Sequence, residues 1–152
     1  MQLGGNKQME FFTDANVRMS AADIQRHVNI NNLTEWCASI DSILDVNDDW
    51  GDIYCIWGEF RIHRELIHDG VRFTLPTCKN AVQWTISPNP EDTAKVTVHC
   101  TINRRHQDED FVESLEEFVE AWRHGLEEWP ERRAAKMNKP CVNCGDTFGG
   151  FG

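Results

Sequence analysis

The feature that most constrains this chain is the regular alternation of apolar and polar residues between Ile53 and Ile102. Side chains of a β-strand point alternately to opposite faces, so a period of two is typical of a sheet with one buried face. The last predicted strand alternates polar residues with an apolar set that consists of Ala94, Val96, Val98, Cys100 and Ile102. The pattern predicts an antiparallel sheet that is apolar on one side.

A hairpin is predicted inside this sheet at Asp69-Gly70, because this dipeptide suits a two-residue type I′ turn. The turn would place Leu66 opposite Phe73, so that apolar side chains meet across the two strands. The agreement between the turn and the alternation fixes the expected register.

The stretch before this hairpin is long for one strand, and Gly58 is the expected place for a bend or bulge. Its predicted inner positions are Tyr54, Ile56, Phe60, Ile62 and Leu66. A second set of residues is expected on the outer face as a solvated polar surface: Arg61, His63, Glu65 and His99.

Two short helices are predicted before the sheet. Ser20 with Asp23 three residues later forms a capping-box pattern. Asn32 with Glu35 gives a second helix start, and apolar residues follow at helical spacing: Leu33, Trp36, Ile40, Ile43 and Leu44. The segment from Met9 to Met19 suits an edge strand or hairpin.

A long amphipathic helix is predicted from Phe111 to Trp129, ended by Pro130. Acidic residues just before it favour the positive end of the helix dipole. Docking its apolar stripe on the apolar face of the sheet would bury both. The expected fold class is therefore α+β: a curved antiparallel sheet with two short helices near the N-terminus and a long C-terminal helix on its apolar face. Residues 1–130 would form one domain, and residues 131–152 a flexible or metal-tethered tail.

Composition excludes some partners. The 152 residues include 15 basic and 25 acidic side chains, and a net charge of −10 disfavours nucleic acid and anionic membranes. No apolar run approaches the length of a membrane span, and the N-terminus lacks a secretory signal pattern, so a cytoplasmic location is expected. Most of the six cysteines are then expected to be reduced, buried thiols.

The order of these elements resembles the helix-grip, START-like superfamily, and within it the branch of polyketide cyclases and the activator of Hsp90 ATPase. The resemblance covers Phe11 to Trp129 and rests on spacing and on aromatic positions such as Trp84 and Trp122. That family's sheet has six strands after the helix pair. Four can be read here directly, and a short strand around Trp50 with a split at Gly58 would complete the set.

The resemblance implies an apolar cavity between sheet and long helix that holds a hydrophobic small molecule, with or without catalysis. Six tryptophans, eight phenylalanines and one tyrosine are many rings for a two-layer domain, and rings that do not close-pack leave space. The candidate ligand-binding residues are Trp36, Tyr54, Phe60, Phe73, Trp84 and Trp122. The alternative is that these rings simply fill the core.

The sharpest local motif is Cys141-Val-Asn-Cys144, which follows a proline and precedes a glycine. Two thiolates at this spacing form half of a tetrahedral zinc site. The other ligands would have to come from His124, Cys78, His99 or a second subunit, as in a homodimer. A redox dithiol and a tail with incidental thiols are the alternatives.

Two functions from different classes follow. The first is a domain that binds a hydrophobic small molecule; the second is an acidic protein-interaction module with a zinc-ordered tail. An enzyme acting on a polyketide-like or aromatic substrate is a third alternative, for which the sequence offers no recognisable nucleophilic triad and no nominated catalytic residue.

Overall fold

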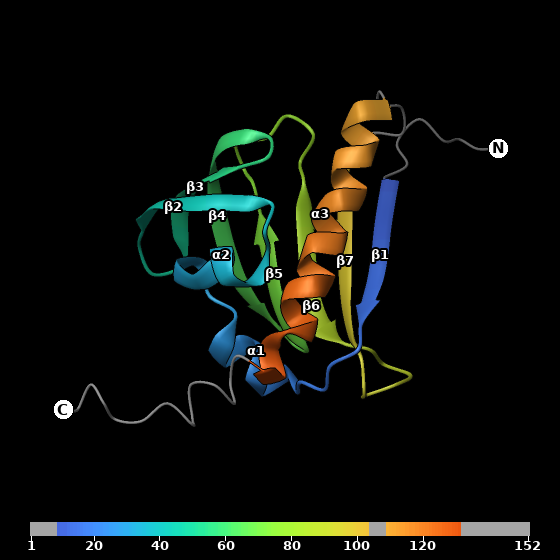
Figure 1. Ribbon diagram of the computed structural model, residues 1–152. Helices are drawn as coiled ribbons and strands as arrows, with labels where there is room; N and C mark the ends of the chain where they lie inside the picture. Colours follow the sequence, from blue (N-terminus) through green and yellow to red (C-terminus); the bar gives the residue numbers. More distant parts are fainter. Residues whose placement is uncertain (1–8, 104–108, 132–152) are drawn as a thin grey trace, which may run out of the picture.

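Seven antiparallel strands form one sheet in the order β1-β7-β6-β5-β4-β3-β2 in the computed structural model, which describes residues 9–103 and 109–131. The sheet curves around the long helix α3, with α1 at the lower end of the molecule and α2 between β2 and α3 (Figure 1). The strands are β1 (Met9–Ala15), β2 (Ile40–Val46), β3 (Trp50–Cys55), β4 (Gly58–Ile67), β5 (Gly70–Thr74), β6 (Gln83–Pro88) and β7 (Val96–Ile102). The helices are α1 (Ala21–His27), η2 (Ile30–Asn32), α2 (Leu33–Trp36) and α3 (Glu109–Glu127). The predicted α+β class is confirmed. Six strands follow the helix pair, but the set is not completed as expected, because Trp50 belongs to β3 and the additional strand is β2.

The stretch predicted as one long strand is two strands joined by a tight turn at Ile56-Trp57. The turn changes which residues face inward. Ile53 of β3 lies opposite Phe60 of β4 on the inner face, whereas Tyr54 points outward and is half exposed. The inner positions predicted at Tyr54 and Ile56 were therefore wrong, because a two-residue turn restarts the alternation. Gly58, with φ of 115°, marks the first residue after the turn.

The next hairpin turns one residue earlier than predicted. Ile67 pairs with Gly70, which leaves His68 and Asp69 as the turn, and Leu66 faces Val71 instead of Phe73. Gly70 is the first residue of β5, where a Cβ atom would lie 2.0 Å from the carbonyl oxygen of Ile86. The glycine therefore serves close strand packing and not the turn.

The second predicted helix is much shorter than expected. It ends at Trp36, and Ile40–Val46 forms the edge strand β2 instead. The pairing of β2 with β3 shifts register twice, between Ile40 and Ser42 and between Ile43 and Asp45. These bulges space the apolar residues irregularly, which imitates a helical period.

The N-terminal predictions agree with the structure. β1 is an edge strand paired only with β7. The Ser20 hydroxyl accepts a hydrogen bond from the Asp23 amide at 3.0 Å, and the Asp23 carboxylate accepts one from the Ser20 amide at 3.1 Å. This capping box starts α1. Arg64 of β4 then donates to the carbonyl oxygens of Val28 and Gln25, which fixes α1 against the sheet.

Helix α3 packs its apolar stripe against the inner face of the sheet, close to β1 and β7. Burying each large side chain contributes about 1.5–3 kcal/mol, so this contact is a dominant stabilising interaction. The buried residues of the stripe are Leu115, Phe118, Val119, Trp122 and Leu126.

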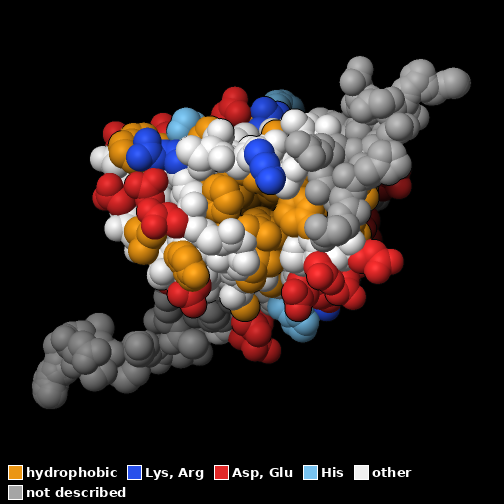
Figure 2. All heavy atoms as spheres, turned by 90° about the horizontal axis from the view of Figure 1, so that it is seen from above, with side chains coloured by type: hydrophobic (Ala, Val, Ile, Leu, Met, Phe, Trp, Pro, Cys, Tyr) orange, Lys and Arg blue, Asp and Glu red, His pale blue; other side chains and the backbone are white. Residues whose placement is uncertain are grey.

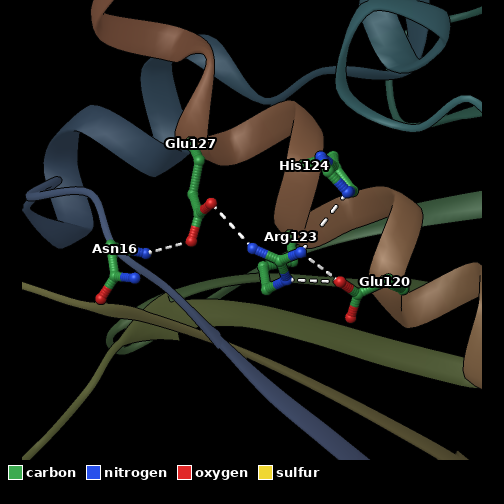
Figure 3. Close-up of polar contacts among 5 residues, drawn as sticks. All are labelled: Asn16, Glu120, Arg123, His124 and Glu127. Carbon is green, nitrogen blue, oxygen red and sulfur yellow. Dashed lines mark hydrogen bonds and ion pairs between the residues drawn. The ribbon is translucent and has the colours of Figure 1, made fainter.

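Polar contacts hold the other side of α3 (Figure 3). The Arg123 guanidinium bonds the Glu120 carboxylate and lies 2.8 Å from that of Glu127. Glu127 also accepts a hydrogen bond from the Asn16 amide at 2.8 Å, just beyond the end of β1. The last turns of the helix are thereby connected to the segment that follows the edge strand.

None of the helices in residues 9–103 and 109–131 has the length and apolar character that crossing a bilayer requires.

Helix α3 approaches α2 very closely at Gly125. A Cβ atom there would lie 1.8 Å from the carbonyl oxygen of Trp36, a separation that real Cβ atoms do not reach. Substituting alanine in an exposed helix position normally stabilises the helix by up to about 1 kcal/mol. Here we expect Gly125→Ala to lower the free energy of unfolding by about 1–3 kcal/mol, because backbone must move.

Chemical denaturation of the parent and of the Gly125→Ala variant measures this difference in the free energy of unfolding. Gly58→Ala is the comparison variant, because an added Cβ atom at Gly58 would have nothing within 4 Å and only the positive φ is strained. A Gly125→Ala protein as stable as the parent would contradict the close packing of α2 on α3.

Candidate ligand-binding site

Three of the six candidate residues meet in the interior. Phe73 of β5, Trp84 of β6 and Trp122 of α3 are fully buried. The ring centroid of Phe73 lies 5.5 Å from that of Trp84 and 6.0 Å from that of Trp122, and the two indoles are 6.3 Å apart. The sheet and the helix thus contribute rings to one aromatic cluster, at spacings typical of direct aromatic contact.

The other three candidates lie elsewhere. Phe60 faces inward from β4 and is partly buried, next to the same core. Trp36 is buried in α2, where its indole N–H is within hydrogen-bonding distance of the His27 carbonyl and the Asn32 side-chain oxygen. Tyr54 is on the outer face, 50% exposed. The structure therefore excludes Tyr54 from the interior, whereas Trp36 belongs to the core and Phe60 packs against it.

An apolar hollow opens at the end of the sheet where α3 begins. Figure 2 views this end from above and shows hydrophobic side chains gathered around a depression. The partly buried apolar residues that the turns and the helix start contribute here are Trp57, Phe111 and Cys78. We call this region the apolar end.

Trp57 is a residue of the apolar end that the sequence did not identify. It occupies the β3–β4 turn, and its indole N–H donates to the Ser114 hydroxyl of α3 at 2.8 Å. Ser114 in turn donates to the Phe111 carbonyl at 2.6 Å. The relevant signal in the sequence was the apolar pair Ile56-Trp57 before Gly58. This pair can be recognised as a turn only when the strand is already known to end there.

Ring contacts lead from the apolar end to the central cluster. The ring centroid of Trp57 lies 6.1 Å from that of Phe111 and 4.8 Å from that of Phe118. Phe118 meets Trp84 edge to face at 4.7 Å. Ring contacts therefore run without a break from Trp57 through Phe118 to Trp84.

The two central indoles have an unusual property. The Nε1 atoms of Trp84 and Trp122 are buried, and neither has a hydrogen-bond partner among the described residues. Leaving one buried donor unpaired costs about 1–3 kcal/mol, so both together are a considerable cost for a domain of this size. Buried indole N–H groups normally find a partner.

The polar outer face consists of separate pairs. The Arg61 Nε atom lies 2.8 Å from Asp52 Oδ1, and the Arg61 Cζ atom lies 4.1 Å from the centroid of the Trp50 ring. The Arg72 Nη1 atom lies 3.3 Å from Glu65 Oε1. On β7, two strands beyond β5, His99 lies 2.8 Å from Glu10 and stacks on the exposed ring of Phe12 at 4.2 Å. The predicted polar residues of this face therefore do not form one cluster.

The described part of the chain contains no group of three or more metal-ligating side chains close enough to hold a metal ion. The suggested partner ligands are separated: Cys78 is in the β5–β6 loop, His99 on the outer face of β7 and His124 near the end of α3. Cys141 and Cys144 lie outside the described residues, so the zinc site stays a prediction.

The fold class follows from the similarity of this chain to solved structures. The chain has the START-like, helix-grip fold: a curved antiparallel sheet that wraps a long C-terminal helix. It superposes on a START superfamily protein from Mycobacterium smegmatis with a TM-score of 0.56 and 13% identity, covering 80% of this chain and 98% of that one. A protein from Thermobifida fusca solved by NMR in solution gives a TM-score of 0.53 and 14% identity, with 86% and 95% covered. A scan of family models and a search of curated sequences found no match.

Zinc binding by the tail can be measured directly. If Cys141 and Cys144 hold zinc, we expect metal analysis of the purified full chain to give half or full stoichiometry, lost on chelation and in the Cys141→Ser variant. Cys37→Ser is the control, because Cys37 is a buried core thiol. Purified protein that takes up no zinc at neutral pH would refute the prediction.

The interior thiols predict a pH dependence of stability. Burial raises the pKa of Cys37 and of Cys100 to about 12, from an ordinary value of 9.0. Because the folded-state pKa values are the higher ones, the stabilising effect is complete below about pH 9 and is lost as pH rises toward 12. We expect the free energy of unfolding to fall across this window, and to fall less steeply in a Cys37→Ala/Cys100→Ala variant. Equal slopes for the two proteins would contradict this account.

Proposed function

We propose that this protein binds a hydrophobic small molecule between the inner face of the sheet and α3, entering at the apolar end. The observation that carries the proposal is the apolar hollow between the strands and the start of α3 (Figure 2). A depression lined by partly buried rings, continuous with a buried aromatic cluster, is the usual character of a small-molecule site. The START-like fold, shared with a START superfamily protein, supports the same function.

Binding requires the rings to move. Trp57 and Phe118 are in contact, and Phe118 contacts Trp84, so the path inward is occupied by side chains. Trp57 sits in a two-residue turn and is tied to α3 through a hydrogen bond to Ser114, and at this partly buried position water can replace that bond. The ligand would thus replace ring–ring contacts with its own.

The chemistry of the interior favours binding over catalysis. Among the described residues, the fully buried side chains around Trp84 and Trp122 are apolar or thiols. The raised pKa of Cys100 keeps this thiol protonated at neutral pH, and a protonated thiol is a poor nucleophile. A hydrophobic ligand is the class of molecule that such a surface stabilises.

The test uses Nile red, a neutral dye whose emission rises in apolar surroundings. We expect saturable binding of one dye per chain. Binding should be weakened at least about tenfold in Phe111→Glu, because the dye would have to remove water from the new carboxylate at the apolar end. An acidic residue is tolerated in the first turn of α3 by the helix dipole, so the variant should remain folded.

Phe12→Glu is the matched control, since Phe12 is exposed on the outer face of β1. It should bind the dye as the parent does. Circular dichroism confirms that both variants are folded. No saturable binding by the parent, or equal loss in both variants, would overturn the proposal.

A further inference from the structure

We infer that the bound molecule carries a carbonyl oxygen at its inserted end, and that this oxygen accepts hydrogen bonds from the indole N–H groups of Trp84 and Trp122. The inference rests on the proposed binding function and adds the chemical class of the ligand. Its basis is that both donors are buried in the path from the apolar end and neither has a partner in the described chain.

The two donors belong to one place. Trp84 comes from the sheet and Trp122 from the helix, and their ring centroids are 6.3 Å apart, so both indoles lie in the same part of the core. Phe73 and Phe118 pack around them and offer no side-chain acceptor. An acceptor for these donors must therefore arrive from outside the described residues or not at all.

The balance of donors and acceptors selects the class. A water molecule could accept from both indoles, but its own two protons would then face aromatic rings, and a buried water typically needs about three polar partners. A hydroxyl oxygen could also accept from both, but its own proton would be left without a partner. A carbonyl oxygen has two lone pairs and no proton, so two indole donors satisfy it completely.

Charge excludes a carboxylate at this position. No cationic side chain is among the buried residues of the described chain, whose buried polar side chains are Asn80 and Thr101. Thr101 pairs with Glu10 and Gln83, and its side chain lies with theirs on the other side of β7. A buried anion without a cation is strongly disfavoured, whereas a neutral ketone is not.

The test compares benzophenone with diphenylmethane, which has the same two rings and a methylene in place of the carbonyl. The ratio of their dissociation constants, measured by calorimetry, defines the ketone preference. We expect this preference to fall about tenfold in Trp84→Phe and in Trp122→Phe, because each variant keeps a ring and loses one N–H donor. Trp50→Phe, a tryptophan under Arg61 on the outer face, should leave the preference unchanged.

A second measurement uses the unmodified protein, so it does not depend on the variants folding. In a proton–nitrogen correlation spectrum, two indole N–H cross-peaks should move downfield with benzophenone and not with diphenylmethane. Diphenylacetate, the charged analogue, should bind more weakly than benzophenone.

The outcomes separate this inference from the proposed function. If both uncharged probes bind, but the preference is unaffected by either tryptophan substitution and no indole cross-peak responds to the ketone, the carbonyl inference is wrong and binding stands. If diphenylacetate binds as tightly as benzophenone, the inference that the inserted acceptor is uncharged is wrong. If neither uncharged probe binds while Nile red does, the carbonyl inference is wrong and the proposed function stands; if Nile red also fails to bind, both fall.

Discussion

The packing of α3 on the inner face of the sheet is the interaction on which the rest of the structure depends. The helix supplies Phe118 and Trp122 to the core, and the sheet supplies Phe73 and Trp84. Neither layer could bury these rings alone, because an isolated sheet or helix leaves its apolar side in water. The absence of a side chain at Gly125 lets the helix approach α2 closely enough for this to happen.

The same packing has different consequences at the two ends of the helix. Near its last turns, α3 is connected to α2 through close backbone contact and to the segment after β1 through Glu127 (Figure 3). Near its start, the contacts with the sheet run through the half-buried rings of Trp57 and Phe111. Regions with fewer buried contacts open at lower free energy, so we expect the apolar end to open more readily than the other end of α3.

Much of the fold could be predicted from the sequence where one rule governed a segment. The capping box at Ser20, the stripe of α3 and the alternation along β6 and β7 each depend on local spacing, and each is confirmed, except that β7 begins at Val96 and leaves Ala94 exposed. Prediction failed where two rules overlapped. The bulges of β2 gave Ile40 and Ile43 a helical spacing, and the turn at Ile56-Trp57 preserved an apparent alternation while reversing its faces.

The candidate site was predictable only in part, for a related reason. Burial of Trp84 and Trp122 follows from their place in periodic segments, and both are buried. Trp57 could not be assigned, because its role depends on where a turn meets the start of a helix more than fifty residues later in the chain.

The unpaired indoles also bear on how the empty and occupied states of the protein compare. Without a ligand, the rings fill the interior and bury a large apolar surface, but the two indole N–H groups have no partner among residues 9–103 and 109–131. An acceptor supplied by the proposed ligand would pair these donors and recover, on binding, the free energy that leaving them unpaired costs. On the proposed binding function, the protein would therefore give up ring–ring contacts of the core in return for hydrogen bonds that the described residues do not supply.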